Sequence, residues 1–162
     1  MRIVNPTTEE TILQRVYPES EIYIREAKFS DDGVAVEVTC CVPRTHFYTA
    51  NPIPYVTAEN YVRCLSQASY LLAEHALRNN LLPQLEVPVE AFLEAAANYE
   101  LYYRSLSMVF HTRVARDEAF VLRLHIKNAR TIRRLDRDYI LFTFSNEKTV
   151  ISGEMSFVYI DR

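Results

Sequence analysis

Hydrophobic and polar residues alternate in two neighbouring stretches of the N-terminal third of the chain. Residues 20–29 place Ile22 and Ile24 on one side of an extended segment, and residues 34–42 (VAVEVTCCV) repeat the alternation with β-branched side chains. A period of two is the pattern of a half-buried strand. Between the two stretches, the turn sequence SDDG ends in Gly33, which tolerates a positive φ. The pattern therefore predicts a β-hairpin.

The period changes to that of an α-helix between Thr57 and Asn80. Apolar residues recur there at the spacing of one helical face, namely Tyr61, Cys64, Leu65, Ala68, Leu71, Leu72 and Ala76. Thr57 is a suitable N-cap, and Glu59 lies in the first turn, where the helix dipole favours a negative charge. A second, shorter helix is predicted after Pro88, in the run VEAFLEAAANY.

The C-terminal part of the chain returns to strand-like patterns. Four strands are predicted at residues 101–114, 119–128, 139–146 and 149–160, and the longest polar break between them covers residues 129–138. Because these strands follow one another without crossover helices, a repeated βαβ unit is excluded. The pattern therefore predicts an α+β fold.

The economical packing of these elements is one antiparallel β-sheet wrapped around one long central helix, with a short extra helix. This arrangement is the hotdog fold. No linker, repeat or break in composition divides the chain, so residues 1–162 are expected to form a single hotdog domain. The usual consequence of this fold is a homodimer, or a higher homo-oligomer, formed through the sheet.

Composition removes several classes of function. The chain has only two glycines, too few for a phosphate-binding loop, a dinucleotide fingerprint or a G-x-S-x-G nucleophile elbow. A net charge of −3 does not favour nucleic acid as a partner. Three cysteines give no disulfide framework, and no stretch resembles a signal peptide or a membrane span. We therefore expect a cytoplasmic protein.

The segment with the most candidate chemistry is residues 45–70, THFYTANPIPYVTAENYVRCLSQASY. It places aromatic, amide and hydroxyl side chains beside the start of the long helix, at Thr57, Ala58 and Glu59. A helix N-terminus offers unpaired N–H donors and a partial positive charge. Such a terminus can hold the oxygen of a thioester carbonyl while negative charge develops on it.

The run YVTAENYVRCLSQASYLLA, preceded by VPRTHFY, resembles the central helix and preceding loop of hotdog-fold acyl-CoA thioesterases, and in particular the FcoT-like long-chain fatty acyl-CoA thioesterases. This resemblance implies a catalytic site of neutral side chains, two Tyr and an Asn. The two Tyr correspond to Tyr23 and Tyr48, and Ser66 stands where the family has Asn, followed by Gln67. Asn60 is a substitute for that Asn if the register of the match differs.

The resemblance further implies hydrolysis of fatty acyl thioesters to free fatty acid and thiol, as part of fatty acid metabolism. The substrate is acyl-CoA or acyl-carrier protein, no metal or redox cofactor is needed, and the site lies at a subunit interface. An arginine cluster containing Arg130, Arg133 and Arg134 lies in the predicted break at residues 129–138. It is either a solvated loop or a clamp for the phosphates of coenzyme A or phosphopantetheine.

Two other functions remain open at the level of the sequence. HFYTANPIPY is similar to the His-Phe-Pro and Asn-Pro elements of hotdog 3-hydroxyacyl thioester dehydratases, with His46 as the base. The position of the dehydratase acid is occupied by Arg63, which is a poor proton donor, and this favours the thioesterase. A non-catalytic acyl-binding protein is the second alternative, because Ser66 departs from the family Asn.

Overall fold

The computed structural model describes residues 2–6, 9–44, 51–132, 137–146 and 151–159. Within them one seven-stranded sheet has the order β1-β2-β3-β5-β6-β7-β4, and every neighbouring pair is antiparallel. The strands are β1 (Arg2–Val4), β2 (Ile24–Phe29), β3 (Ala35–Cys40), β4 (Leu101–Phe110), β5 (Phe120–Ile132), β6 (Arg137–Asn146) and β7 (Ile151–Tyr159). Strands β1 and β4 are therefore the edges of the sheet.

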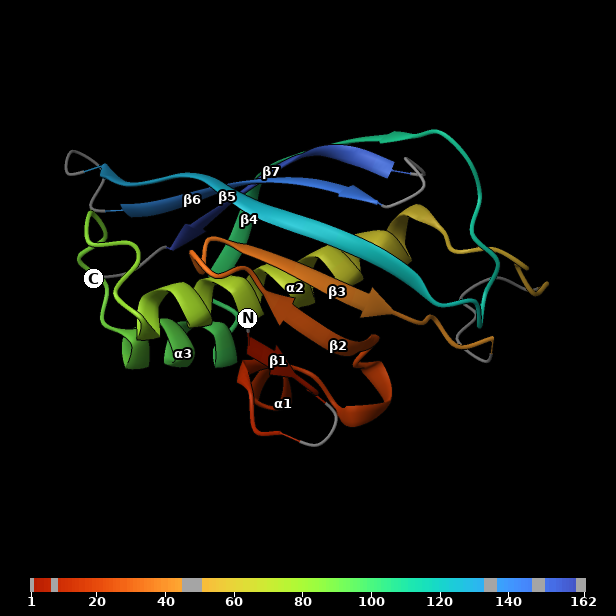
Figure 1. Cartoon of the computed structure of the whole chain (residues 1–162), viewed down its shortest axis with the longest axis horizontal. Coiled ribbons are helices and arrows are strands. Elements are labelled where there is room, and N and C mark those ends of the chain that lie inside the picture. Colours follow the sequence, from red (N-terminus) through yellow and green to blue (C-terminus); the bar gives the residue numbers. More distant parts are fainter. Residues whose placement is uncertain (1, 7–8, 45–50, 133–136, 147–150, 160–162) are drawn as a thin grey trace.

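The helices gather on one face of this sheet (Figure 1). They are α1 (Ile12–Val16), a 3-10 turn η1 (Glu19–Glu21), α2 (Ala58–Arg78) and α3 (Val89–Ala97). Helix α2 contacts β2, β3 and β5, whereas α1 and α3 contact each other and α2. None of the described helices has the length and apolar character needed to cross a membrane.

Helix α2 forms where the periodicity predicts it. Thr57 is the N-cap and forms a capping box with Asn60, and Asn79 is the C-cap. The apolar face predicted from the sequence is buried, and Gln67, Ser69 and other residues outside that face are buried as well. The helix is therefore covered on more than one side.

The hairpin prediction is also confirmed. Strands β2 and β3 pair around a turn in which Gly33 has a φ of 71°. The first strand begins at Ile24 and not at residue 20, because Glu19–Glu21 forms the 3-10 turn. The sequence pattern did not predict β1 and α1, which are too short for a periodic signal; β1 is held by its pairing with β2.

The predicted polar break at residues 129–138 is wrong at its two ends, and residues 133–136 lie outside the described residues. Strand β5 continues to Ile132 and β6 starts at Arg137, and Arg130 pairs with Tyr139 between them. Partner strands impose the extended conformation on polar residues that carry little strand signal of their own. Arg130 therefore lies within a strand and not in a loop.

Alternation along the strands separates an inner face, packed on the helices, from an outer face. Phe29, Val36, Leu124 and Phe144 lie in one register row across four strands and are buried on the inner face. The row beside them contains Lys28, Glu37, Arg123 and Ser145, which belong to the outer face.

Candidate functional site

A group of hydroxyl side chains lies on the inner face, where the middle of α2 meets the N-terminal segment and the edge strand β4. The Tyr17 hydroxyl, at the C-cap of α1, donates a hydrogen bond of 3.0 Å to Oγ of Ser66. The hydroxyl of Tyr103 in β4 is buried, and no described residue meets it with the geometry of a full hydrogen bond. The side chains of Ser66 and Ser69 lie within weak hydrogen-bonding reach of this hydroxyl and lower its pKa. We name Tyr17, Ser66, Ser69 and Tyr103 the hydroxyl cluster.

Burial keeps the phenols of this cluster protonated. Desolvation raises the pKa of Tyr17, although the Ser66 hydroxyl and Arg63 partly oppose the effect. Desolvation also raises the pKa of Tyr103, with smaller opposing contributions from Ser66 and Ser69. At neutral pH both side chains are therefore hydrogen-bond donors and not bases.

Aromatic rings form one wall of the hydroxyl cluster. The Tyr103 ring is stacked on Phe157 at a centroid distance of 4.7 Å, and Tyr70 is stacked on Phe157 at 5.6 Å. Tyr17 lies at a tilt to Tyr70, with a centroid distance of 6.3 Å. These contacts hold the Tyr17 and Tyr103 rings, and they surround the hydroxyl groups with apolar surface.

Gln67 is fully buried and binds the backbone that leads into β2. Its Oε1 accepts a hydrogen bond of 2.9 Å from the Tyr23 N–H, and its Nε2 donates one of 2.7 Å to the Glu21 carbonyl. The Tyr23 side chain is buried, and its hydroxyl accepts a hydrogen bond of 3.3 Å from Arg63. Arg63 also forms an ion pair with Glu21. The catalytic roles expected of Tyr23 and Gln67 stay predictions.

Asn60 organises the N-terminus of α2. Its Oδ1 accepts hydrogen bonds from the Thr57 N–H at 3.1 Å and from the Thr57 hydroxyl at 3.0 Å. Arg116, which is 2% exposed, donates to the same oxygen at 3.0 Å and to the Pro43 carbonyl at 3.1 Å. Arg116 thus joins the start of α2 to the segment that follows β3. Ala58 and Glu59 are exposed beside this junction.

Of the remaining predicted residues, Arg130 is the one that the structure describes. Tyr48, His46, Arg133 and Arg134 lie outside the described residues. Arg130 is exposed on the outer face, where it lines a pocket of about 450 Å³. The structure therefore brings Ser66 into the hydroxyl cluster and Asn60 to the start of α2.

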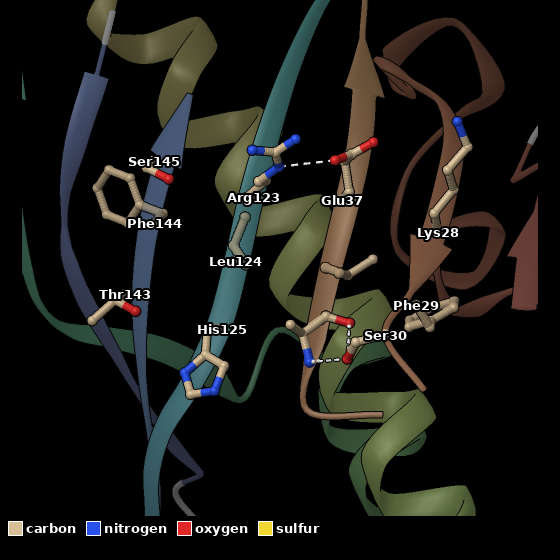
Figure 2. Close-up of a pocket in the computed structure, with 12 residues that line it drawn as sticks. Lys28, Phe29, Ser30, Glu37, Arg123, Leu124, His125, Thr143, Phe144 and Ser145 are labelled. Atoms are coloured by element: carbon tan, nitrogen blue, oxygen red, sulfur yellow. Dashed lines mark hydrogen bonds and ion pairs between the residues drawn. The ribbon is translucent and has the colours of Figure 1, made fainter. Parts of the chain in front are cut away.

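A larger pocket, of about 570 Å³, also lies on the outer face, across β2, β3, β5 and β6. Figure 2 shows Arg123 and Glu37 pointing toward each other across it, joined by an ion pair of 2.8 Å. Lys28, at its side, pairs with Glu26 at 2.7 Å. The basic side chains of this pocket are thus matched by carboxylates.

Three residues of these sites did not emerge from the sequence. Tyr17 follows a helix too short to predict, and Arg116 lies in a loop with no motif. Tyr103 did have a signal, because the alternation in LYYRSLSM puts it on the same face as Leu101. Only the packing of β4 against α2 brings the Tyr103 hydroxyl to Ser66 and Ser69 and so makes it a candidate site residue.

No protein-family model matches the chain, and no curated protein matches it. The fold is similar to that of a candidate thioesterase from Shewanella oneidensis, with a TM-score of 0.57, 11% identity and coverage of 92% of each chain. It is also similar to a sigma28-regulated virulence protein from Campylobacter jejuni, with a TM-score of 0.56, 8% identity and coverage of 97% of this chain and 89% of that one.

The Escherichia coli PaaI protein from the phenylacetic acid degradation operon is a further structural neighbour. Its TM-score is 0.50 at 8% identity, and the match covers 83% of this chain and 78% of that one. At these identities the likeness concerns the fold alone. The chain has the hotdog fold, with an antiparallel sheet and a long helix packed against it.

Proposed function

We propose that the protein hydrolyses fatty acyl thioesters at the hydroxyl cluster. The observation that carries this proposal is the Tyr103 hydroxyl, which is buried, forms no hydrogen bond of full geometry with a described residue and lies within weak hydrogen-bonding reach of Ser66 and Ser69. A buried hydroxyl whose hydrogen bonds are not fully formed costs free energy of folding, at most about 1–3 kcal/mol. A substrate carbonyl oxygen in the cluster would accept its hydrogen bond and remove that cost.

The proposed chemistry uses hydrogen-bond donors and no charged base. The thioester carbonyl oxygen accepts from Tyr103, and a water held by Ser66 attacks the carbonyl carbon. As the new C–O bond forms, the carbonyl electron pair moves onto oxygen, where donors stabilise it. When the C–S bond then breaks, the thiolate leaves with its electron pair and takes a proton from the attacking water. Tyr17 holds the Ser66 hydroxyl through its hydrogen bond.

The start of α2 is too far away to act on the same carbonyl within one chain. Ser66 lies eight residues after Ala58, which corresponds to about 12 Å along a helix that rises 1.5 Å per residue. A second copy whose α2 runs antiparallel would bring its N-terminus beside Ser66. We therefore propose a homodimer with shared sites, in which one subunit supplies the hydroxyl cluster and the other supplies the N–H donors of Ala58 and Glu59.

The free edge of the sheet offers a surface for this dimer. Among the described residues, strand β4 pairs with β7 on one side only, and its Val109 and Phe110 side chains are 53% and 46% exposed. A long edge strand with exposed apolar side chains is usually covered in the native assembly. Pairing of two β4 strands would cover these residues beside the hydroxyl cluster, to which β4 contributes Tyr103.

The fold supports a thioesterase without specifying its substrate. A candidate thioesterase is among the structural neighbours. The proposal further includes membership of the FcoT-like family and a sheet that wraps α2, with a long acyl chain held between the two. It also includes coenzyme A or a carrier protein as the thiol of the substrate. The Arg63–Glu21 ion pair holds a cation at the position of the dehydratase acid. This pair favours the thioesterase over the dehydratase.

The test is a steady-state assay with short-, medium- and long-chain acyl-CoA, comparing Tyr103→Phe with Tyr61→Phe. The Tyr61 hydroxyl is also buried without a hydrogen-bond partner among the described residues, but its ring packs on Phe110 and Phe120. Neither change removes a fully formed hydrogen bond, so neither variant should have a lower melting temperature than the wild type. We expect kcat to fall about 10²–10³-fold in Tyr103→Phe and to be unchanged in Tyr61→Phe. Absence of thioester cleavage by the wild type, or equal rates in the two variants, would refute the proposal.

A further inference from the structure

The pocket of about 450 Å³ on the outer face is formed by strands β4, β5, β6 and β7. Two register irregularities border it, one between Tyr103 and Ser105 in β4 and one between Ile126 and Asn128 in β5. Bulges redirect side chains and are frequent beside binding sites. Here Arg104 and Arg130 reach the same pocket from strands that are not neighbours in the sheet.

Arg104 is held in place by an aromatic ring. Its guanidinium carbon lies 5.0 Å from the ring centroid of Tyr139, a residue that is 8% exposed. This cation–π contact holds the guanidinium over the ring and leaves its N–H groups able to donate to a ligand. Arg130 stands beside this ring, because Arg130 and Tyr139 are register partners in β5 and β6.

The charge in this pocket is not balanced by the residues that line it. Neither arginine forms an ion pair with a carboxylate in the described part of the chain, and no Asp or Glu lines the pocket. The larger outer-face pocket differs, because its Arg123 is paired with Glu37. Two arginines without a carboxylate repel each other, and a bound anion would remove that repulsion.

Neutral hydrogen-bonding groups complete the lining. The Ser105 and Ser156 hydroxyls lie 2.7 Å apart, and Asn128 lines the same pocket. Hydroxyl and amide groups both donate and accept, so they match the hydroxyl groups of a sugar or nucleoside. Guanidinium groups match the oxygens of a phosphate. The volume lies within the range of small-molecule sites, about 300–1,000 Å³.

The geometry points to a binding site for a phosphate ester of a small molecule, with Arg104 and Arg130 on the phosphate and with Asn128, Ser105 and Ser156 on its hydroxyl-bearing part. Two sources supply this chemistry. One is the phosphorylated end of the thiol carrier, an assignment that rests on the proposed thioesterase function. The other is a separate phosphorylated metabolite, which does not depend on that function.

Calorimetric titration with coenzyme A, ADP and inorganic phosphate tests the site without any assay of activity. We expect coenzyme A or ADP to bind the wild type, and both Arg104→Gln and Arg130→Gln to weaken that binding at least about tenfold. The matched control is Arg123→Gln, which removes an outer-face arginine of β5 that is already paired with Glu37. It should leave binding unchanged.

Kinetics distinguish the two sources. If the carrier end binds here, the two variants raise KM for acyl-CoA about tenfold and leave KM for an acyl N-acetylcysteamine thioester, which has no phosphate, unchanged. If a separate metabolite binds, ADP binding is lost while both KM values stay the same. No binding of any of the three probes to the wild type at millimolar concentration, or an equal loss in Arg123→Gln, overturns the assignment.

Discussion

Replacement of Gln67 by methionine separates a structural role for this side chain from a catalytic one. Methionine has nearly the same length and volume but neither donates nor accepts a normal hydrogen bond. The change therefore keeps the packing of a fully buried position and removes the bonds to the Tyr23 N–H and the Glu21 carbonyl. Those bonds fix the segment that enters β2.

The magnitude follows from the two backbone groups that lose their partner. The bond to the Tyr23 N–H is buried, and loss of such a partner costs about 1–3 kcal/mol. Glu21 is half-buried, so water can partly satisfy its carbonyl, at a cost of about 1 kcal/mol. The free energy of unfolding should thus fall by about 2–4 kcal/mol. With an m-value near 2 kcal/mol/M, the urea midpoint should fall by about 1–2 M.

The assay is urea unfolding followed by far-UV circular dichroism, with Gln84→Met at an exposed position as the control. Thioester hydrolysis is measured in parallel, well below the melting temperature of each variant. If Gln67 acts through the backbone alone, kcat stays within about threefold of the wild type. A midpoint within about 0.3 M of the wild type, together with lost activity, would instead show that Gln67 works on the substrate.

Two further predictions concern pH and assembly. Desolvation and, to a smaller extent, Arg2 lower the pKa of His75, which is stacked on Phe29 at 4.0 Å, while Glu74 opposes the shift. The unfolded chain therefore binds the proton more tightly, and stability is complete above pH 6.5 and declines as the pH falls below it. The melting temperature of the wild type should drop more between pH 7.5 and 5.5 than that of His75→Phe, and equal drops would contradict this. For assembly, Ala58→Pro removes one N–H donor at a position where proline suits a helix, and Ser66→Ala removes the proposed water-binding hydroxyl. If sites are shared between subunits, mixing the two inactive variants should restore about a quarter of the wild-type rate. Half of the dimers in the mixture contain one subunit of each variant, and each of these dimers has one intact site out of two. A mixture that is as inactive as the separate variants would exclude shared sites.

The local pattern of hydrophobic and polar residues was sufficient to predict the helices and strands with a strong periodicity. The Thr57 cap, the buried face of α2, the turn at Gly33 and the four later strands all correspond to structure, with ends that shift by a few residues. The pattern failed where pairing with a neighbouring strand, and not the local sequence, determines the extended conformation. Strand β5 continues through Arg130 because it pairs there with β6, and β1 forms because it pairs with β2.

The candidate site was only partly visible in the sequence. Resemblance led to Ser66, but its hydrogen-bond partner in the structure is Tyr17, 49 residues earlier, and not a residue of the predicted set. Arg116 is 56 residues from Asn60, yet the two share a hydrogen bond at the start of α2. Contacts at such separations depend on how the elements pack, and no spacing rule encodes them.

The sequence by itself determined that this is an α+β chain with a β-hairpin, one long amphipathic helix and a run of antiparallel strands, because hydrophobic periodicity is a local property of the chain. Only the tertiary structure decided which hydroxyl groups meet, which arginines share a pocket without a carboxylate, and which strand edge is left open. The physical reason is that burial and charge balance depend on neighbours brought together by folding. Tyr103 is one of 11 tyrosines in the chain, and it becomes a candidate for chemistry only because its hydroxyl is buried beside other hydroxyls without a fully formed hydrogen bond to a described residue.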